Sequence, residues 1–162
     1  MLSFYVHIPY CIKRCGYCDF NTYTPSELQD GATLEIVSND YIDAVLRELD
    51  AAPTDVAPTI FFGGGTPSLL PAHDLGRVIA AIKARNGLTA DCEVTLEANP
   101  DSVTAEKLAE YLQVGFNRIS FGMQSAKPHV LAALDRTHNP ANVEKAITMA
   151  RAAGFKSISV DL

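Results

Sequence analysis

Basic residues, long apolar runs and cysteine are scarce in this sequence, and the first two scarcities exclude classes of protein. Lys and Arg number 13 against 19 Asp and Glu, and the net charge of -6 argues against a nucleic-acid-binding surface. No apolar run approaches the roughly 20 residues that cross a bilayer, so we expect no transmembrane helix. Residues 1–7 carry no basic segment, so we expect no signal peptide and a cytoplasmic location.

The few cysteines are unevenly distributed. Cys11, Cys15 and Cys18 lie close together, whereas Cys92 stands alone. Disulfides are rare in the cytosol, where clustered thiols more often bind metal or take part in chemistry. The remaining composition, 48% hydrophobic and 20% charged, is typical of a globular domain with a sizeable core.

Short apolar runs alternate with longer amphipathic segments along the whole chain. Apolar residues at helical spacing predict helices, and the short runs between them predict strands. We expect strands at residues 4–8, 58–62, 93–97, 118–121 and 157–161, and helices at 39–52, 74–85, 104–114, 128–134 and 139–153.

This alternation predicts an α/β domain built on a parallel sheet. A doubly wound sheet and a TIM-like barrel both fit the pattern. The last residues form an apolar strand, and an open parallel edge is a poor boundary for a complete domain. We therefore expect residues 1–162 to be the N-terminal part of a longer domain, with further segments after Leu162.

The cysteine spacing is C-x3-C-x2-C directly after the first predicted strand. Three thiolates can hold three irons of a [4Fe–4S] cluster and leave the fourth iron open to a cofactor. Cys92 lies at the start of its strand, about 16 Å from the level of the loop in a parallel sheet. Structural zinc sites usually need four protein ligands, and no second C-x2-C pair exists. The spacing favours an iron–sulfur cluster, with a zinc site or plain thiols as the alternatives.

With Tyr17 just before the last cysteine, this loop closely resembles that of the radical S-adenosylmethionine (SAM) superfamily. The wider sequence is similar to the branch of oxygen-independent coproporphyrinogen III oxidases and HemW-like heme chaperones, in residues 5–11, 18–21, 62–68, 97–100 and 120–125. The resemblance spans residues 5–161. It implies a partial parallel (β/α) TIM-like barrel with a [4Fe–4S] cluster on Cys11, Cys15 and Cys18, and bound SAM.

The resemblance also implies SAM contacts in the first half of the chain. Gly64, Gly65 and Thr66 match the turn that binds the methionyl amino group, although a tight strand-to-helix turn alone would explain the glycines. Glu97 ends the third strand, where ligands of parallel sheets lie, and matches a SAM-contacting Glu. The remaining implied contacts are made by two aromatic residues, Tyr5 and Tyr17. Tyr17 would contact SAM through its main chain, and for Tyr5 the alternative is a position in the hydrophobic core.

Three further SAM contacts are implied in the second half. Gln124 follows the fourth strand, and its amide can bond a ribose hydroxyl. Arg136 presents a fork of donors that suits the cofactor carboxylate, although a surface Arg is the simpler interpretation. Asp161 ends the fifth strand and can accept from ribose hydroxyls, although strand-end Asp residues also occur before turns.

One position separates the two branches of the family. The oxidases of this family have the cysteine spacing C-x3-C-x2-C-x-C. This sequence has Phe20 in place of the last cysteine and in this resembles the chaperones. The loop also begins close to Met1, without the N-terminal extension usual in the oxidases. The resemblance therefore favours a chaperone that binds heme, largely through residues after Leu162, and delivers it to heme-dependent proteins, including respiratory ones. Peripheral contact with a membrane is compatible with this role. The alternative is an enzyme that decarboxylates coproporphyrinogen through a SAM-derived radical.

Overall fold

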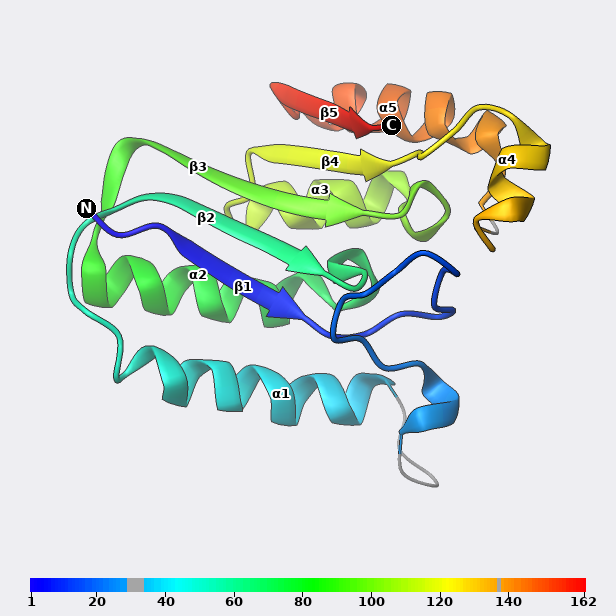
Figure 1. Ribbon diagram of the computed structural model, residues 1–162. Coiled ribbons are helices and arrows are strands. Elements are labelled where there is room, and N and C mark those ends of the chain that lie inside the picture. Colours follow the sequence, from blue (N-terminus) through cyan, green and yellow to red (C-terminus); the bar gives the residue numbers. More distant parts are fainter. Residues whose placement is uncertain (29–33, 137) are drawn as a thin grey trace.

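The computed structural model describes residues 1–28, 34–136 and 138–162. One parallel sheet contains all the described strands, in the spatial order β1-β2-β3-β4-β5 (Figure 1). The strands are β1 (Phe4–Ile8), β2 (Ala57–Gly64), β3 (Leu88–Ala98), β4 (Arg118–Gly122) and β5 (Ser157–Asp161). Spatial order thus follows chain order without reversal.

Helices connect the strands. They are α1 (Leu34–Leu49), α2 (Ala72–Asn86), α3 (Ala105–Gln113), α4 (Pro128–Ala133) and α5 (Pro140–Ala153), with short 3-10 helices η1 (Pro25–Glu27), η2 (Pro67–Leu69) and η3 (Pro100–Ser102). Right-handed crossovers between strands in sequential order place the long connecting helices on the same face. Figure 1 shows α1, α2, α3 and α5 side by side there. The sheet is therefore part of a TIM-like barrel rather than a doubly wound sheet, in which the order reverses.

Several elements extend beyond their predicted bounds. The apolar pattern of the second strand stops at Phe62, yet the backbone ladder continues and pairs His7 with Gly63 and Ile8 with Gly64. β3 begins at Leu88, which pairs with Ala57 before a register shift. In α1, which starts before the predicted residue 39, Val37 already packs on the core. Backbone pairing and packing determine where these elements begin and end, and the periodicity of side chains along the sequence predicts neither of them.

The two faces of the sheet differ in chemistry. Side chains on the helix-covered face are fully buried and apolar, for example Ile60, Leu96 and Phe121. The opposite face, which would be the barrel interior, is polar in β3–β5 and carries Thr95, Arg118, Ser120 and Ser159. This alternation follows from the two-residue period of a strand.

Buried polar contacts hold the loops at the carboxyl ends of β2 and β3 together. The hydroxyl of Tyr111 in α3 donates to the carbonyl oxygens of Ser68 (3.0 Å) and Leu70 (2.9 Å). The Ser68 hydroxyl accepts from the backbone N–H of Asn99 at 3.2 Å. Because each of these groups is satisfied inside the protein, the loop that follows β2 is fixed against the loop that follows β3.

Among the described helices, none is long and apolar enough to cross a membrane.

Candidate functional site

A cavity of about 450 Å³ lies at the carboxyl ends of the strands. In Figure 1 the cysteine loop (dark blue) and α4 both lie beyond the strand tips. All the predicted site residues except Tyr5 line the cavity, namely Cys11, Cys15, Tyr17, Cys18, Gly64, Gly65, Thr66, Glu97, Gln124, Arg136 and Asp161. Parallel strands bring these residues to one edge of the sheet, although they are widely separated in sequence.

The cysteine loop is closed at its base by backbone hydrogen bonds. The N–H of Cys11 donates to the carbonyl of Tyr23 at 3.0 Å, and the N–H of Tyr23 donates to the carbonyl of Pro9 at 2.6 Å. A turn inside the loop is closed by the N–H of Cys18 and the carbonyl of Cys15, at 3.1 Å. These bonds hold the backbone of the loop that carries the three thiols.

The three thiols differ in exposure. Cys11 is buried, whereas Cys15 and Cys18 are half-buried, and all three are free. Burial raises the pKa of the Cys11 thiol, and the nearby sulfurs of Cys18 and Cys15 raise it further. The Thr66 hydroxyl donates to the Cys11 sulfur at 3.8 Å and acts in the opposite direction. Burial and the neighbouring sulfurs therefore both favour the neutral thiol over the thiolate at Cys11.

The thiols also bear on the type of metal. Within residues 1–28, 34–136 and 138–162, no three His, Cys, Asp or Glu side chains are grouped to hold one metal ion. A cubane places a different iron behind each thiolate, so its three ligands need not converge on one point. Cys92 does not line the cavity; it is buried in β3, with its sulfur 3.9 Å from the carbonyl of Glu93. The loop thiols, and not Cys92, are therefore the candidate metal ligands of this cavity.

The glycine turn after β2 packs directly on the cysteine loop. The N–H of Gly65 donates to the carbonyl of Ile8 at 2.7 Å, and that of Thr66 donates to the carbonyl of Tyr10 at 2.8 Å. A Cβ on Gly65 would lie 2.5 Å from the Tyr10 carbonyl oxygen. Gly64 has a φ of 109°, a conformation that side chains disfavour. Glycine is therefore required here by close approach and by backbone conformation.

Glu97 joins this turn to the neighbouring strand. Its Oε2 accepts from the backbone N–H of Gly64 at 3.2 Å. Burial raises the pKa of the Glu97 carboxyl, and the negative charge of Asp161 raises it further, while the Gly64 hydrogen bond lowers it. Two carboxyl groups in one partly buried cavity make a site for a cation or for hydroxyl donors.

Arg136 connects the far side of the cavity to the cysteine loop. Its Nη2 donates to the carbonyl of Gly122 at 2.7 Å, and its Nη1 lies 3.4 Å from the Tyr17 hydroxyl and 3.6 Å from the Cys15 sulfur. Its Nε donates to Nδ1 of the buried His138 at 3.3 Å. These contacts orient the guanidinium toward the cavity, in addition to its predicted role toward a carboxylate.

The ends of β4 and β5 are joined through Asp161. Its carbonyl oxygen accepts from the N–H groups of Met123 (3.2 Å) and Gln124 (2.8 Å). Gln124 has a φ of 61°, which is uncommon for a residue with a side chain. The Asp161 carboxylate accepts from the Ser120 hydroxyl at 2.9 Å. The two residues predicted to contact ribose therefore form one connected unit.

Tyr5 lies outside the cavity. Its ring stacks on Phe61, with 6.0 Å between centroids, and its hydroxyl is 3.3 Å from Nδ1 of His7. It is 57% exposed, on the face of the sheet that the helices leave uncovered. Its ring faces Gly63 on the polar side of the sheet. The predicted contact of Tyr5 with SAM stays a prediction.

Some cavity residues were not predicted from the sequence. Sequence reasoning did not select Ser120 or the loop residues Asn99, Asp101 and Asp135, all of which line the cavity. Ser120 could have been found from its spacing, because it lies two residues before the strand-end Gly122 and therefore on the same face. The loop residues carry no comparable periodic signal.

Comparisons with known proteins identify the family of this chain. A model of the Radical SAM superfamily matches residues 5–162, and the chain belongs to that superfamily. Among curated proteins, heme chaperone HemW from Mycobacterium tuberculosis is 45% identical, with 98% of this chain and 40% of that protein covered. HemW from Escherichia coli is 39% identical over 99% of this chain and 42% of the protein. The chain thus spans about 40% of the length of these relatives.

A solved structure supports the fold. The coproporphyrinogen III oxidase HemN from Escherichia coli, a radical SAM enzyme, superposes with a TM-score of 0.84 at 27% identity, covering 99% of this chain and 36% of that one. The expected partial TIM-like barrel and the resemblance to the chaperone and oxidase branch are both confirmed.

Proposed function

We propose that this chain is the N-terminal part of the radical SAM core of a cytoplasmic heme chaperone. One observation carries the proposal: a single cavity contains the three loop thiols, the glycine turn, the carboxyl groups of Glu97 and Asp161 and the guanidinium of Arg136. The curated relatives named heme chaperone HemW, at 37–45% identity, support the chaperone role.

The donor groups of the cavity match the chemistry of SAM. The methionyl ammonium is a cation that suits the Glu97 carboxylate and the backbone of Gly64 and Gly65, while the methionyl carboxylate suits Arg136. Ribose hydroxyls suit the carboxylate of Asp161 and the amide of Gln124. Cys11, Cys15 and Cys18 would hold a [4Fe–4S] cluster, which when reduced supplies an electron for cleaving the sulfonium of SAM.

Phe20 supports the chaperone over the enzyme. It lines the cavity and is 62% exposed, at the position where the oxidases carry a further cysteine. A phenyl ring there provides no ligand or thiol for chemistry and instead presents an apolar surface beside the cluster loop. The second candidate function, oxidative decarboxylation of coproporphyrinogen, is favoured by the structural similarity to HemN.

One experiment separates the two functions. The complete protein that carries this chain is purified and reconstituted with iron and sulfide without oxygen. Heme binding is then titrated by absorbance, and coproporphyrinogen turnover is assayed in parallel with SAM and a reductant. We expect stoichiometric heme binding, transfer to a heme-free acceptor protein and no turnover. Turnover without stable heme binding would establish the enzyme instead.

A further inference from the structure

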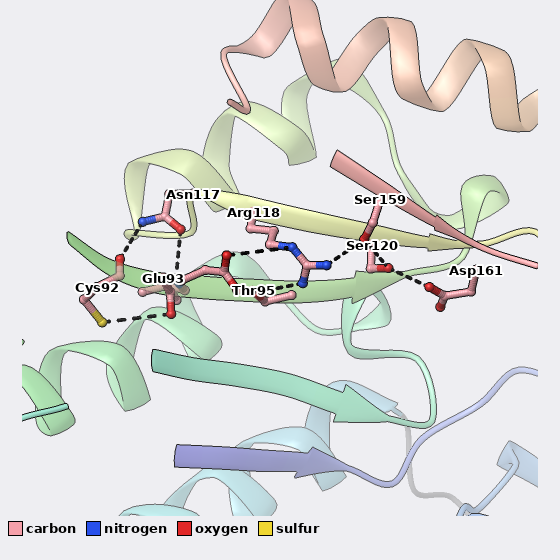
Figure 2. Close-up of polar contacts among 9 residues, drawn as sticks. Cys92, Glu93, Thr95, Asn117, Arg118, Ser120, Ser159 and Asp161 are labelled. Carbon is pink, nitrogen blue, oxygen red and sulfur yellow. Dashed lines mark hydrogen bonds and ion pairs between the residues drawn. The ribbon is translucent and has the colours of Figure 1, made fainter. Parts of the chain in front are cut away.

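A row of polar side chains crosses β3, β4 and β5 on the face without helices (Figure 2). Arg118 Nη2 donates to the Ser159 hydroxyl at 2.9 Å, Ser159 donates to the Ser120 hydroxyl at 2.8 Å, and Ser120 donates to Oδ1 of Asp161 at 2.9 Å. Ser120 and Ser159 are opposite each other in the parallel register. The row therefore ends in the cavity, at a carboxylate predicted to contact SAM.

The direction of this chain of hydrogen bonds is determined at both ends. A guanidinium can only donate, so the Ser159 oxygen must accept from Arg118 and its proton is free to point to Ser120. An ionised carboxylate can only accept, so the Ser120 proton points to Asp161. Each hydroxyl thus accepts once and donates once, and bonds aligned in this way strengthen one another.

Arg118 is itself held in place from the other side. Its Nη1 donates to the Thr95 hydroxyl at 3.2 Å, and Thr95 donates to Glu93 at 3.1 Å. Nε of Arg118 lies 3.9 Å from the second Glu93 oxygen. The guanidinium is therefore anchored on β3, and the chain of hydroxyls begins from a fixed cation.

We propose that Ser120 and Ser159, with Arg118 behind them, are positioning residues that orient the Asp161 carboxylate toward the ribose hydroxyls of SAM. The inference rests on the proposed binding of SAM in this cavity. The carboxylate torsion of an Asp is broad and roughly two-fold, so the orientation of Asp161 depends on contacts such as its hydrogen bond with Ser120. The Ser120 bond occupies Oδ1 and leaves Oδ2 for a ligand. The sheet does not need the hydroxyls for pairing, because β4 and β5 are already joined by their backbone ladder.

The test measures binding of S-adenosylhomocysteine, which cannot react, to the complete reconstituted protein by anaerobic calorimetry. Ser120→Ala should weaken binding about fivefold, as expected for one lost hydrogen bond. Ser159→Ala should weaken binding less, because the direct hydrogen bond from Ser120 to Asp161 remains. Ser159→Thr keeps the hydroxyl and should bind as the wild type does. Ser157→Ala is the matched control, since this serine lies on the same strand and has no part in the row.

A second ligand distinguishes positioning from a general structural role. For the 2′,3′-dideoxy analogue of S-adenosylhomocysteine, which lacks the ribose hydroxyls, the same variants should bind as the wild type does. Equal weakening for both ligands, or no weakening for either, would overturn the inference. Failure of the wild-type protein to bind S-adenosylhomocysteine would overturn the proposed SAM site itself, which is a separate and recognisable result.

Discussion

Nη1 of Arg136 lies 3.6 Å from the sulfur of Cys15, although the two residues are 121 positions apart in the chain. The loop after α4 therefore brings a cation against the cysteine loop. The backbone N–H of Gly16 also donates to the carbonyl of Leu134 at 3.1 Å, which joins the same two segments. A bound cluster would have this guanidinium beside one of its ligands.

Replacing Arg136 by Gln should make the cluster harder to reduce. A nearby positive charge stabilises the reduced, more negative state of the cluster. An interaction energy of about 1 kcal/mol for a half-exposed charge pair corresponds, for one electron, to a reduction potential on the order of 40 mV more negative in the variant. Spectroscopic redox titration of the reconstituted protein measures this shift. Arg151→Gln, on the exposed surface of α5, is the control and should leave the potential unchanged. An unchanged potential in Arg136→Gln would contradict the prediction.

Cys15→Ser should abolish the brown absorbance at about 400 nm that is typical of thiolate-bound clusters, together with most bound iron and sulfide. Cys92→Ser is the matched control, because Cys92 is buried in β3 away from the cavity. It should keep both the colour and the iron content. Retention of the cluster by Cys15→Ser, or its loss in Cys92→Ser, would show that the ligands are assigned wrongly.

Gly65→Ala should disrupt the site because the new methyl group meets backbone oxygens of Ile8 and Tyr10, which cannot rotate away. Overpacking of this kind costs about 1–3 kcal/mol, and we expect lower iron content and weaker SAM binding. Gly87→Ala, at the opposite end of the sheet, has open space around the added carbon and only its positive φ to oppose it. That control should lose some stability but keep the cluster and SAM binding.

Glu97→Gln should separate stability from binding. Burial and the charge of Asp161 raise the pKa of Glu97 in the folded protein above its value in the unfolded chain. The contribution of Glu97 to the free energy of unfolding is therefore fully present at a pH below the pKa of the unfolded chain, and it is lost as the pH rises through the pKa of the folded protein. The variant should therefore melt at a higher temperature than the wild type at pH 7, and this advantage should disappear near pH 4. Affinity for SAM should fall about 10- to 100-fold, because a bond to a charged group is lost. Calorimetric melting curves at both pH values and a binding titration test this, and a lower melting temperature at pH 7 would contradict it.

Short-range patterns were sufficient for much of this protein. The cysteine spacing, the glycine turn and the α/β alternation are local features. The predicted helices at 104–114 and 139–153 began at Thr104 and Asn139, whose side chains cap α3 and α5 in the structure. Residues at strand ends, such as Glu97 and Asp161, were selected by the family resemblance together with the rule that ligands of parallel sheets lie at the strand ends. Strand ends set by pairing, such as Leu88, were not.

The tertiary structure decided what no local pattern can encode. Alternating elements are compatible with a doubly wound sheet and with a barrel, and the sequential strand order selects the barrel, because order depends on which strands pair across the sheet. In the same way, the sequence alone shows only that Ser120 lies in the predicted strand 118–121 and Ser159 in the predicted strand 157–161. Only the register that places Ser120 opposite Ser159 joins them to Asp161, since a hydrogen bond depends on position in space rather than on distance along the sequence.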